Sequence, residues 1–207
     1  AQSFGATYQG KQSCNLSTVG CTSFFPSKPL GCYGDGGAIF TSDDELAQAC
    51  REIRVHGQSQ RYVHTRIGVG GRMDTLQCAI VLAKLERFAW EVEQRQAIGQ
   101  RYNELLDQAA IARIAQRPDR SNVYAQYTIL LAQREPVRKL LEAAGIPTAV
   151  HYPVPLNLQP AYRHLCCPDC TPVSSRLAAT VMSLPMGADL TGAAQDDIVR
   201  ALIGATR

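Results

Sequence analysis

Several features of other protein classes are absent from this chain of 207 residues. No stretch approaches the roughly 18 consecutive apolar residues of a membrane-spanning helix, and the first five residues lack the basic and apolar regions of a secretion signal. No long basic block occurs, and the net charge of +3 comes from 21 basic against 18 acidic residues, which argues against a dedicated nucleic-acid surface. We therefore expect a globular, cytoplasmic protein with neither a membrane nor a nucleic-acid partner.

Paired metal-binding motifs are also absent. The eight cysteines include a dense cluster, Cys166, Cys167 and Cys170, in which the last two have Cys-x-x-Cys spacing. A structural zinc site usually needs two such pairs, and there is no second one. We expect no metal, reduced thiols that behave as small hydrophobic groups, and a variable surface loop around the cluster. Zinc binding by this loop is the alternative.

The patterns that are present predict an α/β protein, and hydrophobic residues, 45 % of the chain, suffice for a core. Short apolar runs separated by glycine predict strands at Phe4–Tyr8, Thr22–Phe25 and Gly37–Phe40. Capping boxes at Ser42–Glu45 and Asp74–Gln77 predict a helix over 43–54 and a long helix from 74 towards 106, bent near Gly99.

The remainder of the chain predicts a small α+β domain. The expected strands cover 123–131 and 148–152, and the expected helices cover 135–144, 173–182 and 193–205. A proline-rich, cysteine-bearing loop precedes the second of these helices. Because a long helix often joins two lobes, we expect the domains to be 1–95 and 96–207.

One lysine differs from the others in its surroundings. Lys28 follows an apolar, strand-like run and precedes a glycine-rich turn, Gly34–Gly37. Most lysines are solvated surface charges. A lysine at the end of a strand can instead lose its proton and form a Schiff base with an aldehyde cofactor.

The run from Ser23 to Gly37 resembles the cofactor-lysine segment of the DegT/StrS family of pyridoxal-phosphate (PLP) sugar aminotransferases. The family pattern is aromatic-Ser-aromatic-aromatic-Pro-Ser/Thr-Lys, then Leu-Gly and Gly-Asp-Gly-Gly. The resemblance implies PLP as cofactor and Lys28 as the residue that forms the Schiff base and transfers the proton. It also implies that Ser23 donates to the PLP phosphate, although an ordinary strand serine is the alternative.

The first residues, Ala1-Gln2-Ser3-Phe4-Gly5, are similar to the family segment Asp-Ala-Ala-Gln-Ser/Ala-x-Gly, which implies that Gln2 contacts the cofactor. The family Asp, which pairs with the pyridine nitrogen, would lie two positions before Ala1. The chain also begins without Met and without the N-terminal portion of the family. We therefore expect the C-terminal part of a fold-type-I PLP transferase, in which the end of the PLP-binding large domain precedes the small domain. Alone, it should be weakly active or inactive.

The segment 68–74 resembles the family's Gly-Tyr-Asn-Tyr-Arg-Met sequence, which a neighbouring subunit inserts into the active site. The resemblance implies that Arg72 holds a substrate carboxylate, for which a bidentate guanidinium is suited. Gly70 stands where the family has Asn, so backbone amides of this loop would replace that side chain at the phosphate. A flexible loop and a surface charge are the alternatives.

The segment 151–156 resembles the family's Tyr-Pro-x-Pro-Leu/His loop, which enters the active site from the small domain. This implies that His151 and Tyr152 bind the sugar, although both rings could instead pack in the core. The segment 183–186 resembles the family's Ser-Leu-Pro sequence, for which we expect a structural role at the lobe boundary.

The matching segments follow the family order along most of the chain. Their amino-acid sequences most resemble those of the branch that aminates UDP-2-acetamido-2-deoxy-3-keto-hexuronic acid. The resemblance implies transfer of an amino group from glutamate to a nucleotide-linked ketosugar, with 2-oxoglutarate as the other product. The expected setting is O-antigen or lipopolysaccharide synthesis by a homodimer with shared active sites. One alternative is a sugar dehydratase of the same family, which has histidine in place of Lys28. The other is a non-catalytic binding or regulatory module.

Overall fold

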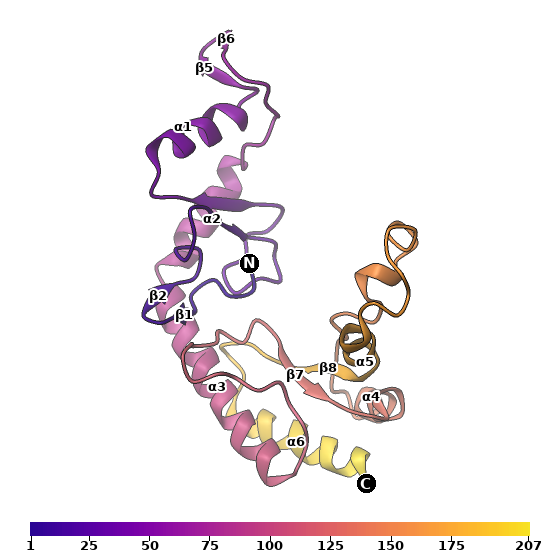
Figure 1. Ribbon diagram of the computed structural model, residues 1–207. Helices are drawn as coiled ribbons and strands as arrows, with labels where there is room; N and C mark the ends of the chain where they lie inside the picture. Colours follow the sequence, from indigo (N-terminus) through magenta and orange to yellow (C-terminus); the bar gives the residue numbers. More distant parts are fainter. The chain divides into compact units, whose positions relative to one another are not determined.

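A computed structural model describes all residues from 1 to 207 (Figure 1). The chain divides into two compact units: unit 1 contains 1–93 and 116–125, and unit 2 contains 94–115 and 126–207. Both units combine helices and strands, as expected for an α/β protein. None of the helices has the length and apolar character required to cross a membrane.

The strands of unit 1 form three short antiparallel pairs. They are β1 with β2, β3 with β4 and β5 with β6, at Thr7–Tyr8, Lys11–Gln12, Gly20–Ser23, Gly37–Phe40, Gln58–Gln60 and Val63–His64. The expected strand at 4–8 is shorter than predicted, because the chain forms a turn up to Gly5 and only Thr7 and Tyr8 pair. Residues 116–125 return to this unit, where the Ser121 amide donates to the Thr7 carbonyl at 2.9 Å.

The helices of unit 1 are α1, Asp44–Ile53, α2, Thr75–Leu85, and the first part of α3, Phe88–Gln108. The prediction of α1 is confirmed, with Asp43 as its N-cap, whose side chain accepts from the Leu46 amide at 3.0 Å. The prediction of a single long helix bent at Gly99 is wrong. The helix is interrupted at 86–87, whereas Gly99 lies inside α3.

Aromatic rings dominate the core of unit 1. The buried cluster contains Phe24, Leu30, Cys32, Val81 and Phe88. The Phe4 ring stacks on Phe88 with centroids 5.5 Å apart and meets Phe24 edge-on at 6.3 Å. This core therefore connects the N-terminal turn, the end of β3 and the α2–α3 region, which all belong to unit 1.

Unit 2 is built around one antiparallel strand pair, β7, Tyr127–Leu130, and β8, Val181–Leu184. Its helices are the remainder of α3 together with α4, η1, α5 and α6, at Arg134–Ala143, Leu156–Leu158, Pro172–Thr180 and Gly192–Thr206. Helices α4 and α6 contact each other. The most deeply buried side chains of the unit include Tyr102, Leu106, Ile129, Leu141, Met182 and Leu202.

Three predictions for unit 2 are wrong in detail. The strand expected over 123–131 is limited to Tyr127–Leu130, the residues that pair with β8. The helix expected over 173–182 ends at Thr180, because Val181–Leu184 pair with β7 and are all buried. The strand expected over 148–152 is reduced to one bridge between Ala149 and Ser183. Prolines at 147 and 153 lack the N–H groups that a longer ladder needs.

Candidate active site

Lys28 lies in a tight turn that follows β3 immediately. Its amide donates to the Phe25 carbonyl at 2.8 Å, and Pro26 occupies the second position of this turn, where its fixed φ angle is favourable. The Ser23 hydroxyl oxygen accepts from the Phe25 amide at 3.1 Å. Ser23 and Lys28 are therefore held by the same local network, centred on the backbone of Phe25.

Helix α2 fixes the segment that follows Lys28. The Gln77 side-chain oxygen accepts from the Tyr33 amide at 2.8 Å, and the Lys84 ammonium donates to the Gly31 carbonyl at 2.5 Å. The capping box expected at Asp74–Gln77 is not formed. Gln77 binds this loop instead, and Asp74, the N-cap of α2, makes no side-chain capping bond. The turn that bears Lys28 is held between the end of β3 and the surface of α2.

The Lys28 side chain is half-buried and makes no hydrogen bond or ion pair within the structure. Most buried ammonium groups are paired, since an unpaired charge is costly to bury. Ser23 is also half-buried, and its own hydroxyl hydrogen has no acceptor in the structure. An amine and a hydroxyl donor are therefore both available to a ligand at this turn.

Gln2 is exposed in the turn that opens the chain. Its neighbour Phe4 contacts Phe24, the residue between Ser23 and Phe25. The structure therefore joins the segments of Gln2 and Lys28 through a shared aromatic contact, although the two side chains themselves make no direct bond.

Gly70 and Arg72 belong to the loop between β6 and α2, and both are exposed. The Gly71 amide donates to the Arg54 carbonyl at 2.9 Å, which ties this loop to the end of α1. Met73 packs against the buried cluster that contains Cys32 of the Lys28 loop. Arg72 therefore adjoins a residue that packs on the same core as Leu30 and Cys32, which follow Lys28 in the chain.

Sequence reasoning missed the residue that organises this loop, Glu52 of α1. Its carboxylate accepts from Arg66 at 2.8 Å, from Thr65 at 3.2 Å and from Gln48 at 2.9 Å. The hydrogen bond from Gln48, followed by that from Arg66, lowers the pKa of Glu52. A glutamate within the buried stripe of an amphipathic helix is the signal that could have revealed it.

His151 and Tyr152 lie in unit 2 and differ in environment. His151 is half-buried, and its Nδ1 atom lies 3.1 Å from the hydroxyl oxygen of Ser183 in β8. Tyr152 is 64 % exposed and meets the His151 ring edge-on, with centroids 5.6 Å apart. Ser183, expected only to shape a boundary, therefore positions a candidate substrate residue. The Tyr152 ring is accessible to a ligand.

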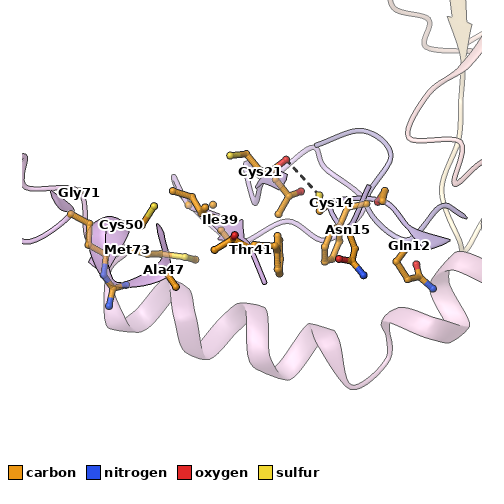
Figure 2. A pocket seen from close by; sticks show the side chains of 18 of the residues that line it. Gln12, Cys14, Asn15, Cys21, Ile39, Thr41, Ala47, Cys50, Gly71 and Met73 are labelled. Atoms are coloured by element: carbon orange, nitrogen blue, oxygen red, sulfur yellow. Dashed lines mark hydrogen bonds between the residues drawn. The ribbon is translucent and has the colours of Figure 1, made fainter. Parts of the chain in front are cut away.

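Unit 1 contains a groove of about 1220 Å³, and the residues of the Lys28 turn do not line it. Figure 2 shows Cys50 and Met73 towards one end, Gln12 and Asn15 at the other, and Ile39 between them. Of the predicted site residues, the groove includes only Arg72. The lining of this groove therefore does not include the lysine turn.

Comparison with known proteins gives consistent matches over almost the whole chain. The model of the DegT/DnrJ/EryC1/StrS aminotransferase family matches residues 1–203. A relative from Pseudomonas aeruginosa, named UDP-2-acetamido-2-deoxy-3-oxo-D-glucuronate aminotransferase, is 58 % identical over 186 residues, which cover 90 % of this chain and 51 % of the relative. A relative from Geobacillus stearothermophilus, named pleiotropic regulatory protein, is 39 % identical over 203 residues, with coverages of 96 % and 55 %.

A solved structure is also similar throughout. The crystal structure of DesV from S. venezuelae in complex with a ketimine intermediate has a TM-score of 0.95 and 35 % sequence identity. The match covers 100 % of this chain and 57 % of that one. The chain thus spans about half the length of the relatives it matches.

Proposed function

Because the chain belongs to the DegT/DnrJ/EryC1/StrS aminotransferase family, we propose that it acts in PLP-dependent transfer of an amino group from glutamate to a keto group of a nucleotide-linked sugar. The proposed acceptor is a UDP-linked 3-keto-hexuronic acid. This choice is supported by 58 % identity to a relative named for a 3-oxo-glucuronate substrate. The other product would be 2-oxoglutarate.

The Lys28 turn is the observation on which the proposal depends. Its half-buried amine has no internal partner, and the backbone around it is fixed from both β3 and α2. These residues fit PLP chemically, since an aldehyde needs an amine and a phosphate needs hydroxyl or amide donors. Ser23 would hold the phosphate, and the exposed amide of Gln2 would contact the ring.

When bound, PLP supplies an electron sink for the carbon that loses its proton. The chain's contribution is the position of the base. The Lys28 amine would take the proton from the donor carbon that bears the amino group and, in the second half of the reaction, would supply a proton to the acceptor carbon. The turn restricts the motion of the Lys28 backbone, which limits the region that the amine can reach.

The remaining candidates would orient substrate. Arg72 is exposed and free to bind a carboxylate through two parallel hydrogen bonds, and the amides near Gly70 would face the phosphate. The exposed ring of Tyr152 would stack on the sugar or hydrogen-bond to it. His151, held by Ser183, would contribute its Nε2 atom.

We place the reaction in the cytoplasm, in precursor synthesis for O-antigen or lipopolysaccharide, by a homodimer whose subunits share their active sites. The eight unpaired cysteines suit a reducing compartment. Residues 1–95 would belong to the PLP-binding large domain, and residues 96–207 would form the small domain.

A regulatory, non-catalytic module is the second candidate. It is favoured by the relative named pleiotropic regulatory protein, which is 39 % identical over 203 residues. A dehydratase of the same family is disfavoured, since it would have histidine in place of Lys28.

Measuring PLP-dependent glutamate consumption in the presence of the UDP-ketosugar separates these proposals. We expect weak turnover that Lys28→Ala abolishes and Lys28→Arg does not restore, because arginine does not deprotonate. Lys139→Ala, which alters an exposed lysine of α4, is the matched control and should retain the turnover of the unaltered chain. PLP binding without any transfer would favour the regulatory module, whereas no PLP binding would contradict both enzyme proposals.

A further inference from the structure

The cysteine-bearing loop of unit 2 contains a tight turn between two thiols. The amide of Cys170 approaches the carbonyl oxygen of Cys167 at 3.4 Å, and the Cys170 thiol donates to the same oxygen at 2.9 Å. Both side chains are exposed and unpaired. Cys167-Pro168-Asp169-Cys170 therefore folds as a β-turn with a cysteine at each end.

This geometry suits a disulfide. The end residues of a β-turn have Cα atoms less than about 7 Å apart, and disulfides span Cα separations of roughly 4.4–6.8 Å. Pro168 occupies the second position, where its fixed φ angle stabilises the turn before any bond forms. A hydrogen bond with the Cys170 side chain raises the pKa of the Cys167 thiol.

A metal site does not account for the same residues. No group of three or more histidine, cysteine or carboxylate side chains in the structure is arranged to hold a metal ion. Two thiols alone are too few for a structural zinc site, which needs four ligands.

Hydrogen bonds connect this turn to the loop of His151. Asn157 lies in η1, and its side-chain amide donates to the Pro168 carbonyl at 3.3 Å. The Asn157 side-chain oxygen accepts from the Thr171 hydroxyl at 2.8 Å. One asparagine thus binds both the cysteine turn and the residue that follows it, and four residues, 153–156, separate it from Tyr152.

We propose that Cys167 and Cys170 form a reversible intramolecular disulfide by exchange with a low-molecular-weight disulfide. One thiolate attacks a sulfur of that compound, forms a mixed disulfide and releases the first small thiol. The second thiolate then displaces the second small thiol and closes the ring. The protein loses two electrons and two protons, and the small disulfide is reduced to two thiols. The proposal does not depend on the aminotransferase activity.

The test equilibrates the native chain in buffers with graded ratios of reduced to oxidised glutathione, followed by alkylation and peptide mass spectrometry. Trypsin cleaves after Arg163 and Arg176, so one peptide contains all three cysteines of the loop. We expect a form with one alkylated cysteine, Cys166, and an internal bond between Cys167 and Cys170. Its fraction should rise with the oxidant and fall again on adding reduced glutathione.

Cys167→Ser and Cys170→Ser should each abolish the internal bond, whereas the control Cys166→Ser should retain it. A bond between Cys166 and Cys167, a mixed disulfide that never resolves, or full alkylation at every ratio would overturn the proposal. Hydrogen exchange tests the connection to η1. Residues 156–158 should exchange at a different rate in the two redox forms, and Asn157→Ala should remove that difference; equal rates in both forms of the unaltered chain would refute the connection.

Discussion

Gly31→Ala tests whether the Lys28 turn is as tightly packed as the contacts indicate. A Cβ atom on residue 31 would lie 2.6 Å from the Pro26 carbonyl oxygen and 2.9 Å from that of Phe25. Both are backbone atoms, and the Phe25 carbonyl already accepts from the Lys28 amide at 2.8 Å. The methyl group can therefore fit only if the turn moves.

The expected cost follows from this crowding. Inserting a methyl group into a packed site costs about 1–3 kcal/mol. With a urea dependence of roughly 1–3 kcal/mol per molar for a small domain, the unfolding midpoint should fall by about 1 M. Since the displaced turn bears Lys28, PLP should also bind more weakly.

Trp90 is the single tryptophan of the chain and belongs to unit 1, so its fluorescence in urea reports on the relevant unit. Gly34→Ala is the matched control, because its Cβ would meet only the flexible Gln77 side chain, at 3.2 Å. An unchanged midpoint for Gly31→Ala, or equal losses for both variants, would refute the packing argument.

Three further predictions concern individual side chains. Ser23→Ala should weaken PLP binding roughly 10- to 100-fold, because a hydrogen bond to a charged group contributes about 1.5–3 kcal/mol, whereas Ser23→Thr should preserve most of the affinity. Equal PLP affinities of Ser23→Ala and the unaltered chain in a spectroscopic titration would exclude the phosphate role. Because the pKa of Glu52 is lowered in the folded chain, its ionised form stabilises the fold fully above the unfolded value of 4.5, and this stabilisation is lost as the pH falls. The urea midpoint of Glu52→Gln should therefore fall less between pH 6 and pH 3.5 than that of the unaltered chain, and identical pH profiles of the two midpoints would contradict this. Ser183→Ala removes the hydroxyl group beside His151 and should raise KM for the nucleotide sugar several-fold while leaving PLP affinity unaltered. An unchanged KM together with weaker PLP binding would contradict a role of His151 in binding the sugar.

Local sequence signals predicted the elements whose determinants are themselves local. The capping box at Ser42–Glu45 and the apolar spacing predict α1 correctly, although the N-cap is Asp43, one residue later than the capping box implies. The final helix, α6, was expected at 193–205 and lies at Gly192–Thr206, with Thr191 as its N-cap. In both helices, the capping side chain and the apolar face lie within one short stretch of sequence.

Features that depend on distant contacts were not predictable in the same way. No glycine or proline marks the interruption after Leu85. Just before it, Lys84 of α2 binds the loop that follows Lys28, and just after it, α3 begins with Phe88, whose ring stacks on Phe4. Similarly, Val181–Leu184 continue an apolar helical pattern and become a strand only because β7 lies beside them. Long-range packing overrides local propensity in both places.

The candidate site shows the same division. The lysine turn could be located from its sequence, because a family resemblance and a local glycine pattern coincide there. The partners that hold it could not, since Gln77 and Lys84 lie about fifty residues further along the chain. The Glu52 network and the contact between Ser183 and His151 likewise depend on pairs that only the folded chain brings together.

The central claim is that Lys28 binds the cofactor covalently. Its most direct test is borohydride reduction of the protein incubated with PLP, followed by peptide mass spectrometry. The account predicts one reduced PLP group, attached to the peptide that contains Lys28, and a visible absorbance band that disappears on reduction. Attachment at Lys84 or another lysine, or an unchanged yield of labelled protein in Lys28→Ala, would contradict it.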